Sequence, residues 1–217
     1  MAYFPMFVEL EGKHCLIIGG GKVAYRKVEV LADFGAELLV IAPEICEEIK
    51  NFAAGNIAYE ERVYMPQDIG NCFLVVAATD DEERNHEIAQ ICRQKKILVN
   101  AVDQIGDCDF IFPSYVKEGA VVGAFSSGGN SPVITQYLKS CMKRTITPFL
   151  GRMADFLGSI RPEVKEKVKT EKERKAVYQS LLVQGLSEEK LPVWEDVQRE
   201  IQKRGNEHGQ NEKTQTE

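Results

Sequence analysis

The stretch HCLIIGGGKVA, residues 14–24, runs from an apolar segment through three glycines into a helical pattern. Residues 14–18 are predicted to form a strand, and apolar side chains recur at helical spacing from Val23 to Phe34. Glycines between a strand and a helix permit a tight turn that other residues rarely adopt. The stretch therefore predicts a strand, a tight turn and a helix in succession.

The rest of the first hundred residues repeats this alternation. Further strands are predicted at 37–42, 58–63, 72–78 and 97–99, with helices opening at Pro43-Glu44 and spanning 80–94. Strands that alternate with helices form a parallel sheet covered on both faces, and ligands bind at the carboxyl ends of its strands. The predicted fold class is therefore α/β, with a Rossmann-type parallel sheet.

The pattern changes from about residue 109. Two extended segments, 109–113 and 120–126, are joined by a turn around Glu118-Gly119. Helices are predicted beyond Ser131-Pro132, and an apolar stripe formed by Tyr137, Leu138 and Cys141 supports the first of them. The last predicted helix contains Trp194, Val197 and Ile201. The tail at 203–217 has no apolar side chain and is predicted to be disordered.

The composition is that of a soluble globular protein, with 44% hydrophobic and 28% charged residues among 217. No apolar run is long enough to cross a membrane, and a net charge of −6 argues against nucleic-acid binding. The six cysteines form no CxxC pair, so we expect free thiols in a cytoplasmic protein and predict no metal site.

The glycine turn fits the pattern G-x-G-x-x-A, with Gly19, Gly21 and Ala24 at the defining positions. Between a strand and a helix this pattern is typical of dinucleotide binding: the backbone approaches a pyrophosphate and the helix N-terminus faces it. Glu44, after the second strand, is the candidate for the adenosine ribose. Two alternatives remain: a glycine turn without a ligand, and a glutamate that only stabilises a helix N-terminus. No P-loop and no YxxxK motif occurs.

Three polar stretches follow strands or extended segments, at 78–85, 99–103 and 126–132. If the strands end at one edge of the sheet, these stretches converge on one crevice. Each also has a simple structural interpretation, because Asp80 and Ser131 are suited to capping helices and Asn100 to a turn.

Residues 139–175 contain eleven lysines and arginines against five aspartates and glutamates, a local net charge of +6. Mixed charge of this kind is found on solvated helix faces and in sites for polyanionic ligands. Both interpretations stay open. The candidate substrate-binding residues are Lys139, Lys143, Arg144, Arg152 and Arg161.

Taken together, these motifs resemble the siroheme synthase N-terminal family, which contains precorrin-2 dehydrogenases, some of them also sirohydrochlorin ferrochelatases. The matching stretches occur in the family's order and cover residues 3 to about 160. They are 4–7, 12–13, 18–24 with Arg26-Lys27, 77–80 with Asn85, 99–103, 108–113 and 126–132.

The resemblance implies an NAD-binding Rossmann domain at 1–113, a dimerisation segment at 114–145 and a helical domain at 146–202. It also implies a homodimer that transfers a hydride from precorrin-2, a tetrapyrrole, to NAD⁺ and so yields sirohydrochlorin. Longer family members carry a methyltransferase domain, and this activity is expected to be absent here. Whether iron is also inserted stays open.

The resemblance carries several roles to individual residues. The family's essential aspartate falls on Asp103 and its active-site serine on Ser127. Its NAD contacts fall on Lys22, Val23, Pro43 and Glu44. From the polar stretches we add Asn100 to the catalytic residues and Thr79 to the cofactor-binding residues. A different class of function, a non-catalytic module that senses NAD(H) or a tetrapyrrole, also fits the glycine turn.

Overall fold

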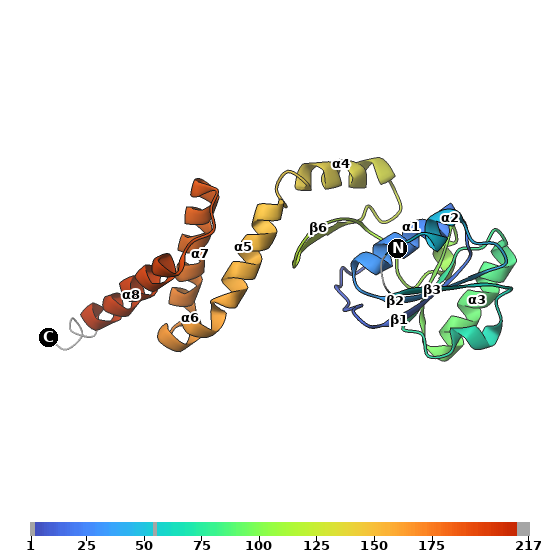
Figure 1. Cartoon of the computed structure of the whole chain (residues 1–217), viewed down its shortest axis with the longest axis horizontal. Helices are drawn as coiled ribbons and strands as arrows, with labels where there is room; N and C mark the ends of the chain where they lie inside the picture. The colour runs from blue at the N-terminus through green and yellow to red at the C-terminus, as the bar shows by residue number, and fades with distance from the viewer. Residues whose placement is uncertain (1–2, 54–55, 212–217) are drawn as a thin grey trace. The chain divides into compact units, whose positions relative to one another are not determined.

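The computed structural model describes residues 3–53 and 56–211 and divides the chain into two compact units, 1–112 and 113–217 (Figure 1). Side chains are described as far as residue 204.

The first unit is built on a five-stranded parallel sheet with the strand order β3-β2-β1-β4-β5. Its strands are β1 His14–Ile18, β2 Glu37–Ala42, β3 Ile57–Glu61, β4 Leu74–Ala77 and β5 Leu98–Ala101. The pairs are in register from His14↔Glu37 and Cys15↔Leu74 onward. The predicted α/β class with a Rossmann-type sheet is confirmed.

Helices cover both faces of this sheet. One face packs against α1 Lys22–Asp33 and α2 Glu47–Lys50. The other face packs against α3 Glu82–Lys95 and the short 3-10 helix η1 Pro66–Ile69. A second 3-10 helix, η2 Ile105–Asp107, follows β5. Successive residues of β1 enter opposite clusters, with Ile17 in the first and Ile18 in the second, as the two-residue period of a strand requires.

Two features predicted for this unit lie at other residues in the structure. The helix expected to open at Pro43-Glu44 begins at Glu47. The Cys46 N–H donates to the Gly20 carbonyl at 2.8 Å, and residues 43–46 pass the glycine turn in a non-helical conformation. The residue that caps α3 is Asp81, whose carboxylate accepts the Arg84 N–H at 3.0 Å, and not Asp80.

The second unit begins with an antiparallel hairpin of β6 Ser114–Glu118 and β7 Val121–Phe125. Residues 109–113, predicted to be extended as the first arm, lie before the hairpin and form no strand. The Asp109 N–H donates to the Val99 carbonyl at 2.8 Å, and the Asp109 carboxylate accepts the Val99 N–H at 3.1 Å. Because a side-chain oxygen takes the place of a backbone carbonyl, no strand ladder forms here.

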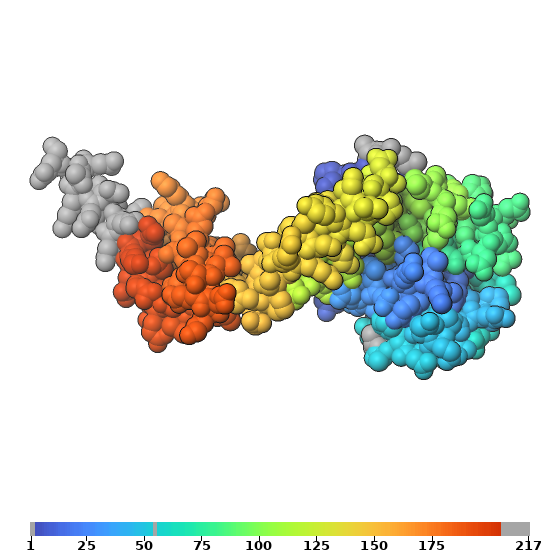
Figure 2. Space-filling model, turned by 90° about the horizontal axis from the view of Figure 1, so that it is seen from above, coloured from blue at the N-terminus to red at the C-terminus, as the bar shows by residue number. Residues whose placement is uncertain are grey.

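Five helices follow in the described part of the second unit: α4 Pro132–Met142, α5 Pro148–Ser159, α6 Arg161–Lys167, α7 Glu171–Glu188 and α8 Trp194–Asn211. Ser131 and Thr147 cap the first two through their side chains, and a proline opens each. A core that includes Val164, Leu181 and Val197 joins α6, α7 and α8, and Figure 2 shows the orange and red segments of the chain packed together.

The C-terminal tail was expected to be disordered from residue 203, but α8 continues to Asn211. Lysine, arginine, glutamine and glutamate are good helix formers and can extend a helix whose first turns are anchored in a core. The remaining part of the predicted tail, 212–217, lies outside the described residues.

Candidate cofactor and substrate site

The strand order of the first unit creates a crevice at the carboxyl edge of the sheet. After β1 the chain continues to β2 on one side of β1, whereas β4 and β5 lie on its other side. Ligands of open α/β sheets bind where the connections diverge in this way. The residues that follow β1, β2, β4 and β5 are therefore the candidates for a site.

Two of the three glycines after β1 are required by the fold itself. Gly19 has a φ of +128°, donates its N–H to the Ile41 carbonyl at 2.9 Å, and would place an added Cβ 2.1 Å from the Ala78 oxygen. A Cβ on Gly20 would lie 2.0 Å from the Glu44 oxygen. These two residues let β1, β2 and β4 end close together.

Gly21 is different, because neither its backbone nor its neighbours require glycine. Its φ is −87°, a value any residue adopts, and nothing lies within 4 Å of an added Cβ. It precedes α1 without capping it through a side chain, and the first turn of α1 contains no acidic residue. The open space and the exposed helix N–H groups fit a phosphate-bearing ligand.

A cavity of about 650 Å³ lies beside this turn, and we call it the dinucleotide pocket. Five of the eight predicted cofactor-binding residues line it, together with side chains that the sequence did not single out. The predicted lining residues are Gly19, Gly21, Pro43, Glu44 and Thr79; the others include Ile45, Tyr64 and Arg84.

The other three predicted cofactor-binding residues lie in the first turn of α1. Ala24 is fully buried in the core between α1 and the sheet, so its role is to allow close packing. Lys22 is exposed at the first position of the helix. Val23 is exposed and lines a second cavity, described below.

Thr79 is held in the dinucleotide pocket by a buried amide. The Asn85 side chain, 2% exposed, accepts the Thr79 N–H at 3.2 Å and the Thr79 hydroxyl at 2.8 Å, and donates to the Thr79 carbonyl at 3.0 Å. Asn85 belongs to the polar stretch 78–85, but nothing in the sequence pattern assigns it a positioning role.

Tyr64 and Arg84 reach the pocket only through tertiary folding. Tyr64 lies between β3 and η1, and its hydroxyl is buried without a hydrogen-bond partner among the described residues. Burial raises the pKa of this hydroxyl to about 12. Arg84 lies in the first turn of α3, with a guanidinium nitrogen 3.8 Å from the Asp81 carboxylate.

A second cavity, of about 490 Å³, lies at the end of β5 and contains Asp103; we call it the Asp103 pocket. Asp103 has a φ of +61° in the turn after β5 and an exposed side chain. Among the described residues its carboxylate has no hydrogen-bond or salt-bridge partner. Val23, Arg26 and Lys27 from α1 line the same cavity.

The turn that carries Asp103 is tied to α3. His86 Nδ1 lies 2.7 Å from the Asp107 carboxylate, and Arg93 donates to the same carboxylate at 3.2 Å. These contacts lower the pKa of Asp107, the hydrogen bond from His86 contributing most. Gln104 also donates to the Glu82 carbonyl at 2.8 Å.

Asn100 is not a turn residue, as one interpretation of the sequence had it. It belongs to β5, is 7% exposed, and donates its amide N–H to the Phe110 carbonyl at 2.9 Å. It also lines the Asp103 pocket, so it both braces the segment after η2 and contributes to the cavity wall.

Ser127 belongs to the second unit, between β7 and α4. Its hydroxyl accepts the Ser131 N–H at 2.9 Å and donates to the Ser131 carbonyl at 3.0 Å. Gly128 and Gly129 follow with φ values of +64° and +88°. Ser127 therefore closes a tight loop immediately before α4.

The five basic residues predicted to bind substrate also lie in the second unit, on α4, after it, and on α5 and α6. The Lys139 ammonium lies 5.5 Å from the centre of the Tyr115 ring. Lys143, Arg144, Arg152 and Arg161 are exposed, and none of the five has a carboxylate partner among the described residues.

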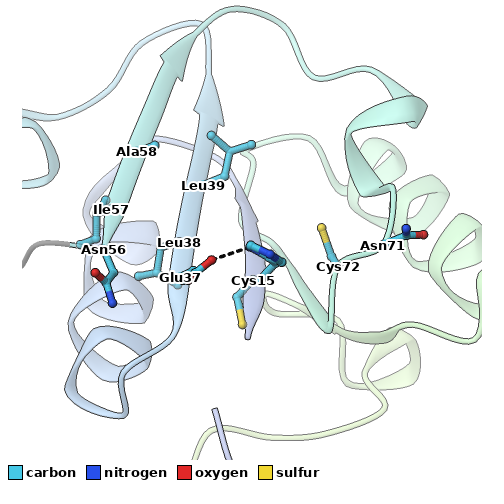
Figure 3. Close-up of a pocket in the computed structure, with 10 residues that line it drawn as sticks. Cys15, Glu37, Leu38, Leu39, Asn56, Ile57, Ala58, Asn71 and Cys72 are labelled. Atoms are coloured by element: carbon cyan, nitrogen blue, oxygen red, sulfur yellow. Dashed lines mark ion pairs between the residues drawn. The ribbon is translucent and has the colours of Figure 1, made fainter. Parts of the chain in front are cut away.

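A third cavity, of about 610 Å³, lies at the opposite, amino edge of the sheet (Figure 3). It is lined by residues that begin strands, and His14 Nδ1 forms an ion pair with Glu37 at 2.8 Å. Cys15 and Cys72 line it with side chains pointing in different directions. All six cysteines are free, and burial raises the pKa of Cys15 to about 12.

Within the described residues, no three His, Cys, Asp or Glu side chains are grouped as metal ligands would be. Within the same residues, no helix is both long and apolar enough to span a membrane.

Residues 6–114, half of the chain, match a family model described as "Putative NAD(P)-binding". The chain is 35% identical over 189 residues to a siroheme synthase of Nitrosococcus oceani, an alignment that covers 87% of this chain and 40% of the relative. The chain belongs to the siroheme synthase N-terminal family. A siroheme synthase of Photorhabdus laumondii is 37% identical over 180 residues, covering 82% of this chain and 38% of the relative.

Membership of the siroheme synthase N-terminal family agrees with two further comparisons. Residues 150–191 match a model described as the sirohaem synthase dimerisation region, which lies C-terminal to the 114–145 segment predicted for dimerisation. The structure of SirC, precorrin-2 dehydrogenase, superposes with a TM-score of 0.66 at 21% identity, covering 93% of this chain and 98% of that one, and supports the fold. The chain spans about two fifths of the length of the siroheme synthases it matches.

Proposed function

We propose that this chain is an NAD⁺-dependent dehydrogenase that oxidises precorrin-2 to sirohydrochlorin. The observation that carries the proposal is the position of the α1 N-terminus between two cavities. Gly21 lines the dinucleotide pocket, whereas Val23, two residues later, lines the Asp103 pocket. A dinucleotide bound across this helix start would have one end in each cavity.

The dinucleotide pocket would hold the adenosine half. Pro43 and Glu44 follow β2, where the ribose of the cofactor binds in this type of sheet. The Glu44 carboxylate can accept hydrogen bonds from ribose hydroxyls but would repel a 2′-phosphate. We therefore propose NAD⁺ rather than NADP⁺ as the cofactor. The exposed N–H groups at the start of α1 would bind the pyrophosphate.

The Asp103 pocket would hold the nicotinamide and the reacting edge of the tetrapyrrole. Bound NAD⁺ supplies the hydride acceptor. Loss of a hydride leaves a positive charge on the substrate, and an adjacent proton must then be released to complete the oxidation. The Asp103 carboxylate, unpartnered and facing the cavity, is suited to stabilise this charge and accept the proton.

Residues of the second unit would complete the enzyme. We propose that Ser127 contributes to the active site, as the family resemblance implies, and that Lys139, Lys143, Arg144, Arg152 and Arg161 bind substrate carboxylates. Lys143, Arg144, Arg152 and Arg161 are exposed, which leaves them free for such contacts.

We also propose a homodimer. The dimerisation-region match supports it, and α4 exposes Val133, Ile134 and Tyr137 to 77%, 55% and 67%, an apolar face of the kind that partner subunits cover. Free thiols throughout the chain fit a reducing, cytoplasmic location. Sedimentation analysis of the purified chain tests the dimer directly.

An anaerobic assay tests the dehydrogenase. Purified protein is mixed with precorrin-2 and NAD⁺, and NADH formation is followed together with the sirohydrochlorin spectrum; stoichiometric formation of both is expected. A chain that binds NAD⁺ or tetrapyrrole without turnover would instead be the non-catalytic sensor. Adding Fe²⁺ after the first reaction tests whether iron is inserted as well.

A further inference from the structure

The Asp103 pocket contains two basic side chains, Arg26 and Lys27, to which no role has yet been given. Both belong to α1 and line the cavity together with Asp103. They lie in the same unit as Asp103, unlike the basic residues at 139–161. Their positive charges would therefore act on any ligand that binds next to the Asp103 carboxylate.

The Lys27 ammonium is partly withdrawn from water but has no acceptor. It lies 3.9 Å from the centre of the Phe112 ring, and among the described residues no carboxylate or hydrogen-bond acceptor is found for it. Burial lowers its pKa, and the nearby Cys108 and Asp103 oppose this shift. The contact with the ring fixes the position of the ammonium while its three N–H donors stay available.

Placing a cation in a half-buried position without a hydrogen-bond acceptor costs free energy, unless a bound ligand supplies the acceptor. The aromatic ring offsets part of that cost, but it cannot accept three hydrogen bonds. Arg26, one residue earlier, is exposed at the same cavity and likewise has no partner among the described residues. Its planar guanidinium is suited to a bidentate contact with a carboxylate.

We propose that Lys27 and Arg26 bind a carboxylate side chain of the tetrapyrrole, and so fix the ring that bears it against Asp103. The inference rests on the proposed function and specifies one substrate contact within it. The cavity then presents opposite charges to two parts of one substrate. The ammonium of Lys27 faces a permanent negative charge, and the carboxylate of Asp103 faces the positive charge that develops on oxidation.

The variants for testing this are Lys27→Gln, Arg26→Gln, the double variant, and Lys27→Arg, which keeps the charge. Lys13→Gln is the matched control, because the Lys13 ammonium also lies over an aromatic ring of the same unit, 5.9 Å from the centre of Phe73, yet does not line the Asp103 pocket. Arg26 is exposed, so Arg26→Gln tests the proposal without risk to folding.

Three quantities are measured for each variant: the affinity for sirohydrochlorin by fluorescence titration, the KM for precorrin-2, and the Kd for NAD⁺ by calorimetry. Lys27→Gln and Arg26→Gln should each weaken sirohydrochlorin binding and raise the KM about tenfold, the loss expected for one charge-assisted hydrogen bond. NAD⁺ affinity should stay unchanged, Lys27→Arg should recover most of the loss, and Lys13→Gln should match the wild type.

The outcomes separate this proposal from the dehydrogenase proposal. A wild-type chain that binds sirohydrochlorin through Lys27 and Arg26 but does not oxidise precorrin-2 would support the contact and refute the reaction. Normal turnover with unchanged KM and sirohydrochlorin affinity in the double variant would refute the contact alone. A fall in NAD⁺ affinity with unchanged tetrapyrrole binding would assign the two cations to the cofactor and overturn the proposal.

Discussion

The side-chain amide of Asn85 forms three hydrogen bonds with Thr79: it accepts the N–H and the hydroxyl and donates to the carbonyl. The amide is buried at the start of α3, while Thr79 follows β4 and lines the dinucleotide pocket. One side chain on the helix thus sets the backbone conformation at the end of a strand. The pocket wall depends on this contact.

Asn85→Ala should therefore destabilise the protein and weaken NAD⁺ binding together. Leaving the polar groups of Thr79 unpaired is expected to cost about 2 kcal/mol of unfolding free energy. Urea denaturation with and without NAD⁺ measures both effects. Asn51→Ala is the control, because it removes an exposed hydrogen bond from the Asn51 amide to the Glu47 carboxylate at 3.3 Å. This variant should change neither the unfolding free energy nor the NAD⁺ affinity. A stable Asn85→Ala variant with normal affinity would contradict the positioning role.

Alanine substitutions at Gly20 and Gly21 should affect different properties, stability in the first case and NAD⁺ binding in the second. Gly20→Ala places a Cβ 2.0 Å from the Glu44 oxygen and should lower the melting temperature sharply. Gly21→Ala meets nothing within 4 Å and should leave the melting temperature unchanged. If the pyrophosphate binds there, however, Gly21→Ala should weaken NAD⁺ binding about tenfold. Calorimetric scans and NAD⁺ titrations decide this, and normal affinity in Gly21→Ala would refute the assignment.

The two glycines also show what the sequence could reveal. The strand, the turn and the helix are local features, and residues 14–24 determine them through apolar runs, glycine and helical periodicity. The G-x-G-x-x-A pattern requires glycine at position 21 and leaves position 20 open to any residue, whereas the fold requires glycine at 20 and not at 21. That distinction depends on Glu44 and its carbonyl, which the fold brings from the residues after β2.

The side chains to which the sequence analysis gave no role share one property: residue type and spacing alone do not indicate that they face a cavity. Tyr64 lies in a connection, Arg84 on an exposed helical turn, and Lys27 reads as an ordinary solvated helix residue. The same limit explains the misplaced extended segment at 109–113. Its conformation is set by Asp109 pairing with Val99, a contact that hydrophobic periodicity does not report.

Glu44 should determine the choice between NAD⁺ and NADP⁺. Glu44→Ser removes a carboxylate from the dinucleotide pocket, so NADP⁺ affinity should rise about tenfold while NAD⁺ affinity falls. Titrating both dinucleotides against the wild type and Glu44→Ser checks this. Tighter binding of NADP⁺ than NAD⁺ by the wild type would show that Glu44 does not face the ribose. Arg84, which lines the same pocket, would then be the candidate to bind the 2′-phosphate.

The basic residues of the second unit make a separate prediction. Arg144→Ala combined with Arg152→Ala removes two exposed guanidinium groups and should raise the KM for precorrin-2 without changing NAD⁺ affinity. The effect should shrink at high salt, since exposed charges are screened. Steady-state kinetics at two salt concentrations measure it. An unchanged KM would identify these arginines as part of a solvated face.

Asp103→Asn is the sharpest test of the proposed chemistry. Asparagine is almost isosteric with aspartate and adopts positive φ readily, so the turn at +61° should persist. It cannot accept a proton as a carboxylate does, nor can it neutralise a developing positive charge. A positioned base contributes roughly 10²–10⁴-fold to a rate, and the kcat should fall within that range.

The affinities of Asp103→Asn separate catalysis from structure. The adenosine and pyrophosphate contacts proposed for NAD⁺ lie in the dinucleotide pocket, which does not include Asp103, so the Kd for NAD⁺ should stay close to that of the wild type. Sirohydrochlorin affinity should change little, because the positive charge that Asp103 opposes exists only during the reaction. If Asp103 served only the turn, asparagine would preserve turnover, since it is at least as well suited to that conformation. A near-normal kcat would thus remove Asp103 from the mechanism, and joint loss of kcat and NAD⁺ binding would indicate a displaced turn instead.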